Sequence, residues 1–312
     1  MKKTEFRDVH GILLLDKPQG LSSNQAMQRA RHLLRAKKAG HTGSLDPLAT
    51  GLLPICFGEA TKIAGYLLGS SKAYAAECKL GVTTTTDDSE GEVVETRPVP
   101  TLSSELIEAA LKNLRGKITQ IPPVYSALKQ GGVALYKRAR RGEEVTAPPR
   151  EVEVLRLDLI EHVGDTLKLH VECGSGTYVR SLVRDLGAAL GCGAHLTALR
   201  RLWVEPFREP TMATLEQVDA LAQSQPEALD ALLLPLELGL GALPALRLSE
   251  EETLRLSQGK MLSRPQSSEV LLCRALAPSD RLVALVEIDA AGCVRVKRGF
   301  NAVSLPPTVE NI

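Results

Sequence analysis

The residue types that are suited to catalysis are concentrated in one loop, which runs from Gly40 to Pro54. The loop holds one carboxylate, one imidazole and several hydroxyls between glycines and prolines. Glycine lets the backbone approach a ligand closely, and Pro47 stiffens the chain directly after Asp46, so the loop can hold a carboxylate in a set direction. The residues alone leave two interpretations open, a catalytic carboxylate and an Asp-Pro turn.

Metal, nucleotide and disulfide chemistry are not indicated by the sequence. No His, Cys or carboxylate ligands stand at metal-ligand spacing. The acidic run 87–92 lacks the alternation of a calcium loop and predicts a solvated turn, and the glycine turn 174–176 is not a phosphate-binding loop. The cysteines form no C-x-x-C pair, so we expect reduced, mostly buried thiols at Cys56, Cys78, Cys173, Cys192, Cys273 and Cys293.

Length, charge and hydropathy bound the class of protein. A chain of 312 residues with 44% hydrophobic content is long enough for a large core and a smaller second domain. The 38 Lys and Arg nearly balance the 37 Asp and Glu, so any nucleic-acid footprint must be a local patch. The N-terminus lacks the apolar run of a signal peptide, and prolines interrupt the apolar stretch 231–246. We expect a soluble, cytoplasmic protein.

The elements that flank the loop are predicted from hydrophobic periodicity. Residues 12–15 predict a buried strand that is closed by a turn at 17–20. A helix should follow, capped at 22–23 and ended by Gly40. One side of this helix would carry a basic stripe made of Arg31, Arg35 and Lys38. Such a stripe is either a solvated face or a contact for RNA.

The middle of the chain predicts a hairpin, a helix and a basic segment. Strands are expected at 74–82 and 92–95, joined through the acidic turn, and a capped helix at 103–114. Prolines then force 120–126 into an extended conformation. The segment 129–141 interleaves aromatics with basic charge, which is typical of a surface for looped nucleic acid. Its basic residues are Lys129, Lys137, Arg138, Arg140 and Arg141.

The second half predicts one more strand and helix, followed by a small domain. Alternation predicts a half-buried strand at 166–173, and a helix capped near Thr177 should run to Gly191. The proline-punctuated segment around 235–244 predicts the domain boundary, followed by a capped helix at 249–259. A small barrel would suit the strands expected at 270–273, 282–288 and 293–296.

Ordered sequence blocks relate the chain to a known family. The central motif of the bacterial TruB-type tRNA pseudouridine synthases, which act on position 55, is closely resembled by residues 41–51 (HTGSLDPLATG) and 58–62 (GEATK). Other blocks follow in the order of that family, at 16–20, 72–74, 120–129, 176–182 and 194–202. The resemblance is strong from residue 10 to about residue 205 and weak in the tail.

The resemblance implies a fold, an activity and a substrate. The fold would be α/β (α+β), with a mixed, largely antiparallel central sheet and flanking helices. A catalytic domain would span 1–245, with an RNA-binding thumb at about 120–150, and a small PUA-like β-barrel would span 246–312. The activity would be isomerisation of uridine 55 in the T-loop of tRNA to pseudouridine, without cofactor or metal because the product is an isomer.

The resemblance also assigns the residues that act on the base. Asp46 would be the nucleophile, attacking either C6 of uracil or C1′ of ribose. Arg180 would keep that carboxylate ionised, although on its own it suggests an ion-paired surface residue of a helix. Tyr74 would stack on the base and is a candidate to take the C5 proton; on its own it suggests packing at a sheet surface. Tyr178 and Leu199 would line the uracil pocket, although expected helical positions suggest ordinary core.

Two further residues and the partners complete the prediction. His41 would stack into the T-loop to fill the space left by the extruded base, and Lys17 would support the site. The expected partner is tRNA, bound through its T-arm and acceptor stem by a monomer without guide RNA, protein partner or membrane. Three alternatives stay open. They are a tRNA-folding chaperone that needs no chemistry, a guide-dependent dyskerin-like enzyme, and an aspartate hydrolase, which lacks a second carboxylate at a recognisable spacing.

Overall fold

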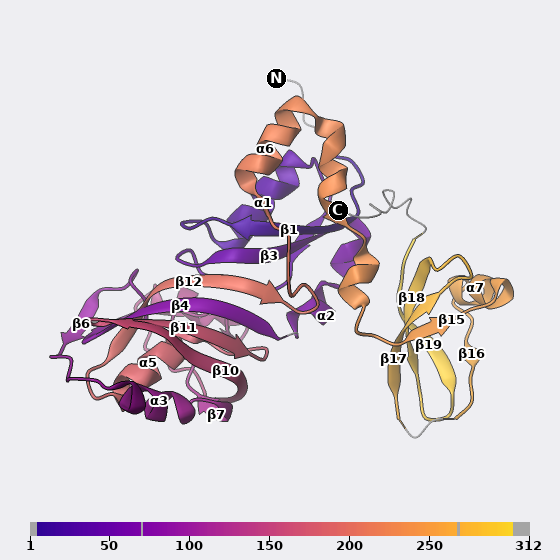
Figure 1. The fold of residues 1–312 in the computed structure, drawn as a ribbon. Coiled ribbons are helices and arrows are strands. Elements are labelled where there is room, and N and C mark those ends of the chain that lie inside the picture. The colour runs from indigo at the N-terminus through magenta and orange to yellow at the C-terminus, as the bar shows by residue number, and fades with distance from the viewer. Residues whose placement is uncertain (1–4, 70, 267–268, 302–312) are drawn as a thin grey trace.

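The computed structural model describes residues 5–69, 71–266 and 269–301, and Figure 1 shows a large sheet flanked by helices beside a smaller, separate sheet. Residues 302–312 of the expected C-terminal domain lie outside the described residues. In the described part of the chain, none of the helices combines the length and the apolarity that a membrane crossing needs. The six cysteines are free thiols, and all except Cys293 are buried, as expected.

The strand pairing of the large sheet tests the predicted fold class. Among the described residues it has ten strands; eight follow the order β13-β1-β3-β12-β4-β11-β10-β7, while β2 pairs with β3 and β14 with β1. The β1–β13 and β3–β12 pairs are parallel and the others antiparallel, so the predicted mixed, largely antiparallel sheet is confirmed. The strands are β1 Gly11–Lys17, β2 Ala39–His41, β3 Thr50–Phe57, β4 Lys72–Leu80, β7 Gly116–Gln120, β10 Arg150–Val163, β11 Thr166–Cys173, β12 Ala194–Val204, β13 Ala213–Thr214 and β14 Leu233–Leu234.

Helices cover this sheet in two groups (Figure 1). One group packs on β1 and β3, and the other packs on β4, β10 and β11. The second core also takes in Leu45 and Leu48, so the loop that carries Asp46 is anchored by its own apolar side chains. The helices are α1 Ser23–Leu33 and α6 Leu215–Ser224 in the first group, α3 Ser104–Lys112 and α5 Val179–Ala189 in the second, and the short α2 Ala64–Leu68, η1 Gly58–Lys62, η2 Pro226–Leu232 and η3 Leu236–Leu240 between elements.

The first helix ends earlier than predicted, so the prediction of a basic stripe along one face of this helix is wrong. α1 begins at a Ser22 capping box but ends at Leu33, because Arg35 takes a left-handed φ of 52° and the chain turns into β2. Arg35 and Lys38 therefore do not continue a helical face. The Nε of Arg35 donates to the carbonyl of Glu5 instead.

The middle of the chain matches its predictions in part. The strand expected at 74–82 is β4, which ends at Leu80 and pairs with β11 and β12, so the predicted hairpin between it and the next strand is wrong. A separate short strand, β5 Val82–Thr84, forms the hairpin with β6 Val93–Thr96 instead. The basic segment folds as a small β-hairpin, β8 Lys129–Gln130 with β9 Val133–Ala134, followed by the short helix α4 Leu135–Ala139. We call residues 120–150 the thumb.

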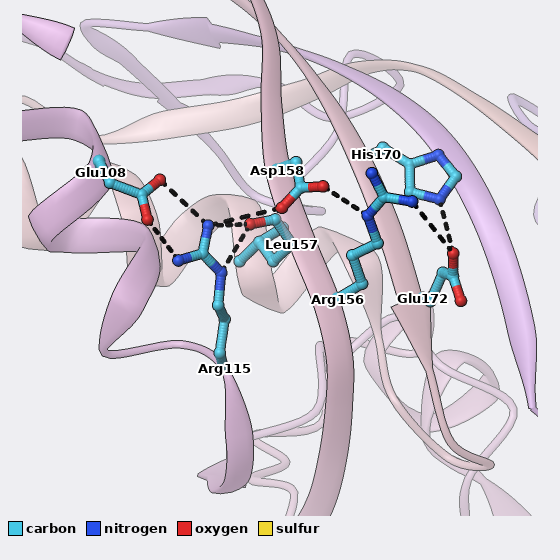
Figure 2. Close-up of polar contacts among 7 residues, drawn as sticks. All are labelled: Glu108, Arg115, Arg156, Leu157, Asp158, His170 and Glu172. Carbon is cyan, nitrogen blue, oxygen red and sulfur yellow. Dashed lines mark hydrogen bonds and ion pairs between the residues drawn. The ribbon is translucent and has the colours of Figure 1, made fainter.

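A chain of polar contacts ties α3 to the sheet (Figure 2). Arg115, at the start of β7, lies between Glu108 of α3 and the carbonyl of Leu157 on β10. Figure 2 shows the chain continuing through Asp158 and Arg156 to Glu172 and His170 on β11. These side chains are partly exposed, so each ion pair contributes little stability, and the chain mainly orients its members.

The smaller sheet lies in the last part of the chain. Its order is β15-β17-β18-β19-β16, and β15 and β16 form its edges, so the expected barrel is a curled half-barrel. Leu276, Leu282 and Leu285 of this sheet share an apolar cluster with Ile12 and Leu14 of β1. The elements are β15 Ala245–Arg247, α7 Glu250–Ser257, β16 Leu262–Ser263, β17 Leu271–Leu276, β18 Leu282–Ile288 and β19 Cys293–Gly299. The helix α7 has the predicted Ser249–Glu252 capping box.

Candidate active site

The loop between β2 and β3 is held on both sides, which fixes the position of Asp46. The hydroxyl of Ser23 accepts from the amide of Leu45 at 2.7 Å and donates to the carbonyl of the same residue at 3.1 Å. The amide of Gly20 donates to the carbonyl of Pro47 at 2.8 Å. The loop is therefore attached to the start of α1 immediately before the aspartate and to the turn between β1 and α1 immediately after it.

Lys17 lies behind this loop and outside the cavity lining. It is fully buried at the end of β1, and its Nζ donates to the carbonyls of Pro18 at 2.8 Å and Leu21 at 2.5 Å. Burial lowers the pKa of Lys17 to about 8, and the Asp46 carboxylate partly opposes this shift. The ammonium group thus fixes the turn that follows β1 against α1.

Arg180 contacts Asp46 directly. Its Nη2 lies 2.9 Å from Oδ2 of Asp46, and its Nη1 lies 3.3 Å from Oδ2 of Asp88. The same guanidinium donates to the carbonyls of Thr86 and Tyr125, each at 2.9 Å. With 5% of its side chain exposed, Arg180 is a buried hub and not a surface helix residue.

The electrostatics of Asp46 combine opposing effects. Its side chain is 43% exposed, while its carboxylate is closely surrounded by protein. Burial raises the pKa of Asp46; Arg180 opposes this rise, and Asp88 adds to it. Arg180 lowers the pKa of Asp46 and so favours the ionised carboxylate, as predicted. Burial has the larger effect, so the pKa of Asp46 is raised overall.

Asp88 is the functional candidate that sequence reasoning missed. The acidic run was expected to be a solvated turn, but the Asp88 side chain is 3% exposed and pairs with Arg180. Its Oδ1 accepts hydrogen bonds from the hydroxyl of Thr86 and the amide of Glu90. A second carboxylate therefore does lie near Asp46, but it faces Arg180 from within the protein and does not line the cavity.

A cavity of about 320 Å³ opens beside the ion pair, at the lower end of the size range of small-molecule sites. The structure brings to its lining Asp46, Tyr74, Tyr178, Arg180 and Leu199, together with Gly43, Ser44, Lys72 and Arg201, which were not predicted as site residues. His41, like Lys17, does not line it. His41 lies at the end of β2, and its buried Nδ1 has no hydrogen-bond partner.

Tyr74 and Leu199 come from neighbouring strands. Tyr74 lies on β4 and is 7% exposed, and Leu199 lies on β12, so the helical position expected for Leu199 is wrong. Burial raises the pKa of Tyr74, and the nearby Arg201 opposes the rise. The phenol is therefore protonated at neutral pH.

Tyr178 lies just before α5 and connects it to the thumb. It is the N-cap residue, so the cap expected near Thr177 is displaced by one residue, and no side chain of the helix caps it. Gln120 holds the backbone of this residue: its Oε1 accepts from the amide of Tyr178 at 2.8 Å, and its Nε2 donates to the carbonyl of Tyr178 at 3.1 Å. The buried Gln120 thus joins the base of the thumb to the helix that carries Arg180.

The arrangement supplies a carboxylate, a guanidinium and an aromatic surface in one cavity. No group of three or more His, Cys, Asp or Glu residues that could hold a metal ion occurs in the part of the chain that the structure describes. A carboxylate beside aromatic side chains is a lining that suits nucleophilic chemistry on a planar ligand.

Comparisons with known proteins agree with the motif. A family model described as TruB family pseudouridylate synthase (N terminal domain) matches residues 31–179, and one described as tRNA pseudouridylate synthase B C-terminal domain matches residues 180–241. A protein named tRNA pseudouridine synthase B from Xanthomonas campestris pv. campestris (strain B100) is 56% identical over 300 residues, which cover 96% of each chain. Proteins with the same name from Xylella fastidiosa and Stutzerimonas stutzeri are 55% and 49% identical, over 96% and 94% of this chain and 99% and 96% of theirs.

Solved structures share the fold. A chain from a structure of an H/ACA RNP bound to a substrate RNA containing 2′-deoxyuridine superposes with a TM-score of 0.73 at 25% identity, covering 96% of this chain and 87% of that chain. A chain from the archaeal box H/ACA sRNP Nop10-Cbf5 complex superposes with a TM-score of 0.72 at 24% identity, covering 97% and 90%.

Proposed function

The chain belongs to the TruB family of pseudouridine synthases, and from this premise we propose that it converts uridine 55 in the T-loop of tRNA to pseudouridine. The observation that carries the proposal is the pairing of Asp46 with a buried Arg180 at 2.9 Å, beside a cavity walled by Tyr74, Tyr178 and Leu199. One carboxylate held at an aromatic and apolar pocket suits attack on a planar base.

The reaction balances without a co-reactant. Asp46 attacks the nucleotide at C6 or C1′, and the bond between N1 and C1′ breaks. The uracil then turns within the cavity, a bond forms between C5 and C1′, and the bond between Asp46 and the nucleotide breaks, which returns the free carboxylate. C5 gives up a proton and N1 gains one, so the product is an isomer and neither metal nor cofactor is consumed.

We assign to Tyr74 the stacking on the base and a role near C5, because it lines the same cavity as Asp46. Because its raised pKa keeps the phenol protonated, Tyr74 can accept the C5 proton only as its own proton leaves. Tyr178 and Leu199 would hold the faces of the ring while it turns.

The target base must first leave its stack, which costs about a few kcal/mol. We assign His41 to the vacated space, where stacking is worth about 1–3 kcal/mol per base. Burial lowers the pKa of His41, and the positive charge of Arg201 lowers it further, so the imidazole is neutral and readily desolvated. Lys17 would act only as the support described above.

The RNA would be held by the thumb and by the C-terminal, PUA-like half-barrel, with the T-arm under the thumb and the acceptor stem on the half-barrel. In the thumb, the guanidinium of Arg140 lies 5.7 Å from the ring centre of Tyr136, which combines charge with a stacking surface. The domain boundary near 245/246 belongs to this proposal. So do a monomeric state and a cytoplasmic location.

The test incubates the purified protein with an unmodified T-arm stem-loop, without other RNA or protein, and locates pseudouridine by chemical tagging and mass spectrometry. Tagging at position 55 alone supports the proposal. Activity that needs an added guide RNA would favour the dyskerin-like alternative, which the 24–25% identity to the H/ACA proteins makes weaker than the 49–56% identity to the bacterial relatives. A tRNA-folding function without isomerisation would show binding and no tagged product.

A further inference from the structure

The cavity has a second charged end, which the proposed chemistry does not use. Arg201 of β12 and Lys72 of β4 both line it, and we call these two residues the cationic end. Arg201 is 1% exposed; its Nε donates to the carbonyl of Leu52 at 2.7 Å, and its Nη2 donates to the carbonyl of Gly43 at 3.2 Å. The guanidinium also hydrogen-bonds to the side chain of Tyr74, so these contacts together use three of its five N–H donors.

Arg201 forms no ion pair with a carboxylate of the described residues. Arg180, at the other charged centre of the cavity, faces two aspartates, whereas none of the ion pairs among residues 5–69, 71–266 and 269–301 includes Arg201. Buried charges in proteins are normally paired, because desolvation of a lone charge is costly. The guanidinium is therefore a site that would gain from a bound anion.

The neighbours of Arg201 respond to its unbalanced charge. Burial lowers the pKa of Lys72 to about 8, and the second cause is repulsion by Arg201. The same charge also depresses the pKa of His41 after burial has done so. The pKa of Asp46 responds mainly to burial, Arg180 and Asp88, and Arg201 is not among the charges that shift it.

Gly43 brings the loop that carries Asp46 close to the cationic end. Gly43 has a φ of 108°, which favours glycine, and the position that a Cβ would occupy lies 3.6 Å from Nη1 of Arg201 and 3.8 Å from Cε of Lys72. Both cationic side chains thus border the same small space beside the loop that carries Asp46.

We propose that Arg201 and Lys72 form a phosphate subsite, which binds the backbone phosphodiester adjoining the nucleotide held over Asp46. The identity of the ligand rests on the proposed function, since the phosphodiester is the anionic group that such a nucleotide brings into the cavity. The subsite would hold the backbone in place while the freed uracil turns. If Arg201 had only a structural role and simply attached the loop to β12, RNA binding would not depend on one particular phosphate.

The test uses T-arm stem-loops in which one phosphate at a time, on either side of the target uridine, is replaced by a neutral methylphosphonate. Equilibrium binding is measured for the wild type and for Lys72→Met, Arg201→Met and Lys79→Met. Lys79 is the matched control, because it lies on the same strand and pairs with Asp165 outside the cavity. Circular dichroism checks that each variant is folded.

For the wild type and Lys79→Met, one methylphosphonate should weaken binding about tenfold, which equals about 1.4 kcal/mol. In Lys72→Met and Arg201→Met the same methylphosphonate should weaken binding less than about threefold, because the contact with the phosphate is already lost. If Arg201→Met does not fold, Lys72→Met decides. An equal loss in all the proteins at every position overturns the subsite. Binding is measured apart from turnover, so a wild type that shows this pattern but makes no pseudouridine refutes the proposed function and leaves the subsite standing.

Discussion

Asp46 and Arg180 lie 2.9 Å apart at the cavity, although one comes from a loop near the start of the chain and the other from a helix in its second half. The nitrogen of Arg180 that contacts Asp46 also donates to the carbonyl of Tyr125 in the thumb. The position of the thumb base and the charge of the carboxylate are therefore physically connected through one guanidinium.

The first prediction concerns stability. Asp46→Asn should stabilise the protein at pH 7, because it leaves Arg180 paired one-to-one with Asp88. The folded pKa of Asp46 lies above its unfolded value, so the folded state binds more protons between the two values, and stability falls as pH rises through that window. The stability that Asp46→Asn gains should thus be absent below pH 3.8, the ordinary pKa of the carboxyl group. It should be constant at pH values above the pKa of Asp46 in the folded protein.

Urea denaturation of both proteins between pH 3 and pH 8 checks this. Because the Asp46 side chain is 43% exposed, solvent screens the effect, and we expect about 0.5–1 kcal/mol at most. A wild type that is more stable than the variant at pH 7 would show that the ion pair outweighs burial.

The second prediction concerns Arg180. Lysine keeps the charge but lacks the planar set of donors that reaches two carboxylates and two carbonyls, so Arg180→Lys should lower the single-turnover rate by about 100-fold. With less opposition to burial, the pKa of Asp46 should rise further. The acidic limb of the pH–rate profile should then move to higher pH, whereas an unshifted limb would separate Arg180 from the ionisation of Asp46.

The third prediction concerns the base of the thumb. Gln120→Leu removes both bonds to the backbone of Tyr178. The carbonyl of Tyr178 keeps its bond from the amide of Leu182, but the amide of Tyr178 is left unpaired, at a cost of about 1–3 kcal/mol. Hydrogen exchange at 120–126 should quicken and the reaction rate should fall. Gln223→Leu, at an exposed position of α6 outside the thumb, is the control and should change neither. Equal protection from hydrogen exchange in both variants would show that Gln120 does not anchor the base of the thumb to α5.

The fourth prediction concerns His41. His41→Phe keeps a ring and removes a buried nitrogen that has no partner, so stability should not fall and RNA affinity should stay within about threefold. His41→Ala loses the stack and should weaken RNA binding about tenfold or more. Binding measured with the stem-loop separates the cases, and equal affinities of the two variants would exclude stacking.

Much of the framework could be predicted from the sequence, for reasons that are local. Alternation located β11 with its actual bounds, capping residues located α3 and α7, and the loop motif located Asp46. The loop of Asp46 is recognisable because its glycines and prolines are consecutive in the sequence.

The remainder depends on tertiary structure. The end of α1 was missed because a non-glycine residue, Arg35, takes a left-handed φ. Leu199 was placed on a helix because a short apolar run does not distinguish helix from strand. Nothing in the acidic run marks Asp88 as its buried member, and nothing near Arg201 shows that no carboxylate faces it. Both facts arise only when strands and loops far apart in the sequence meet.

The most direct test of the central claim compares wild type with Asp46→Asn in a single-turnover reaction on unmodified tRNA, with tRNA binding measured on the same samples. The nucleophilic role of Asp46 predicts tagged product at position 55 for the wild type and none for the variant, with equal affinity for tRNA. Product formed by Asp46→Asn at the wild-type rate would contradict that role.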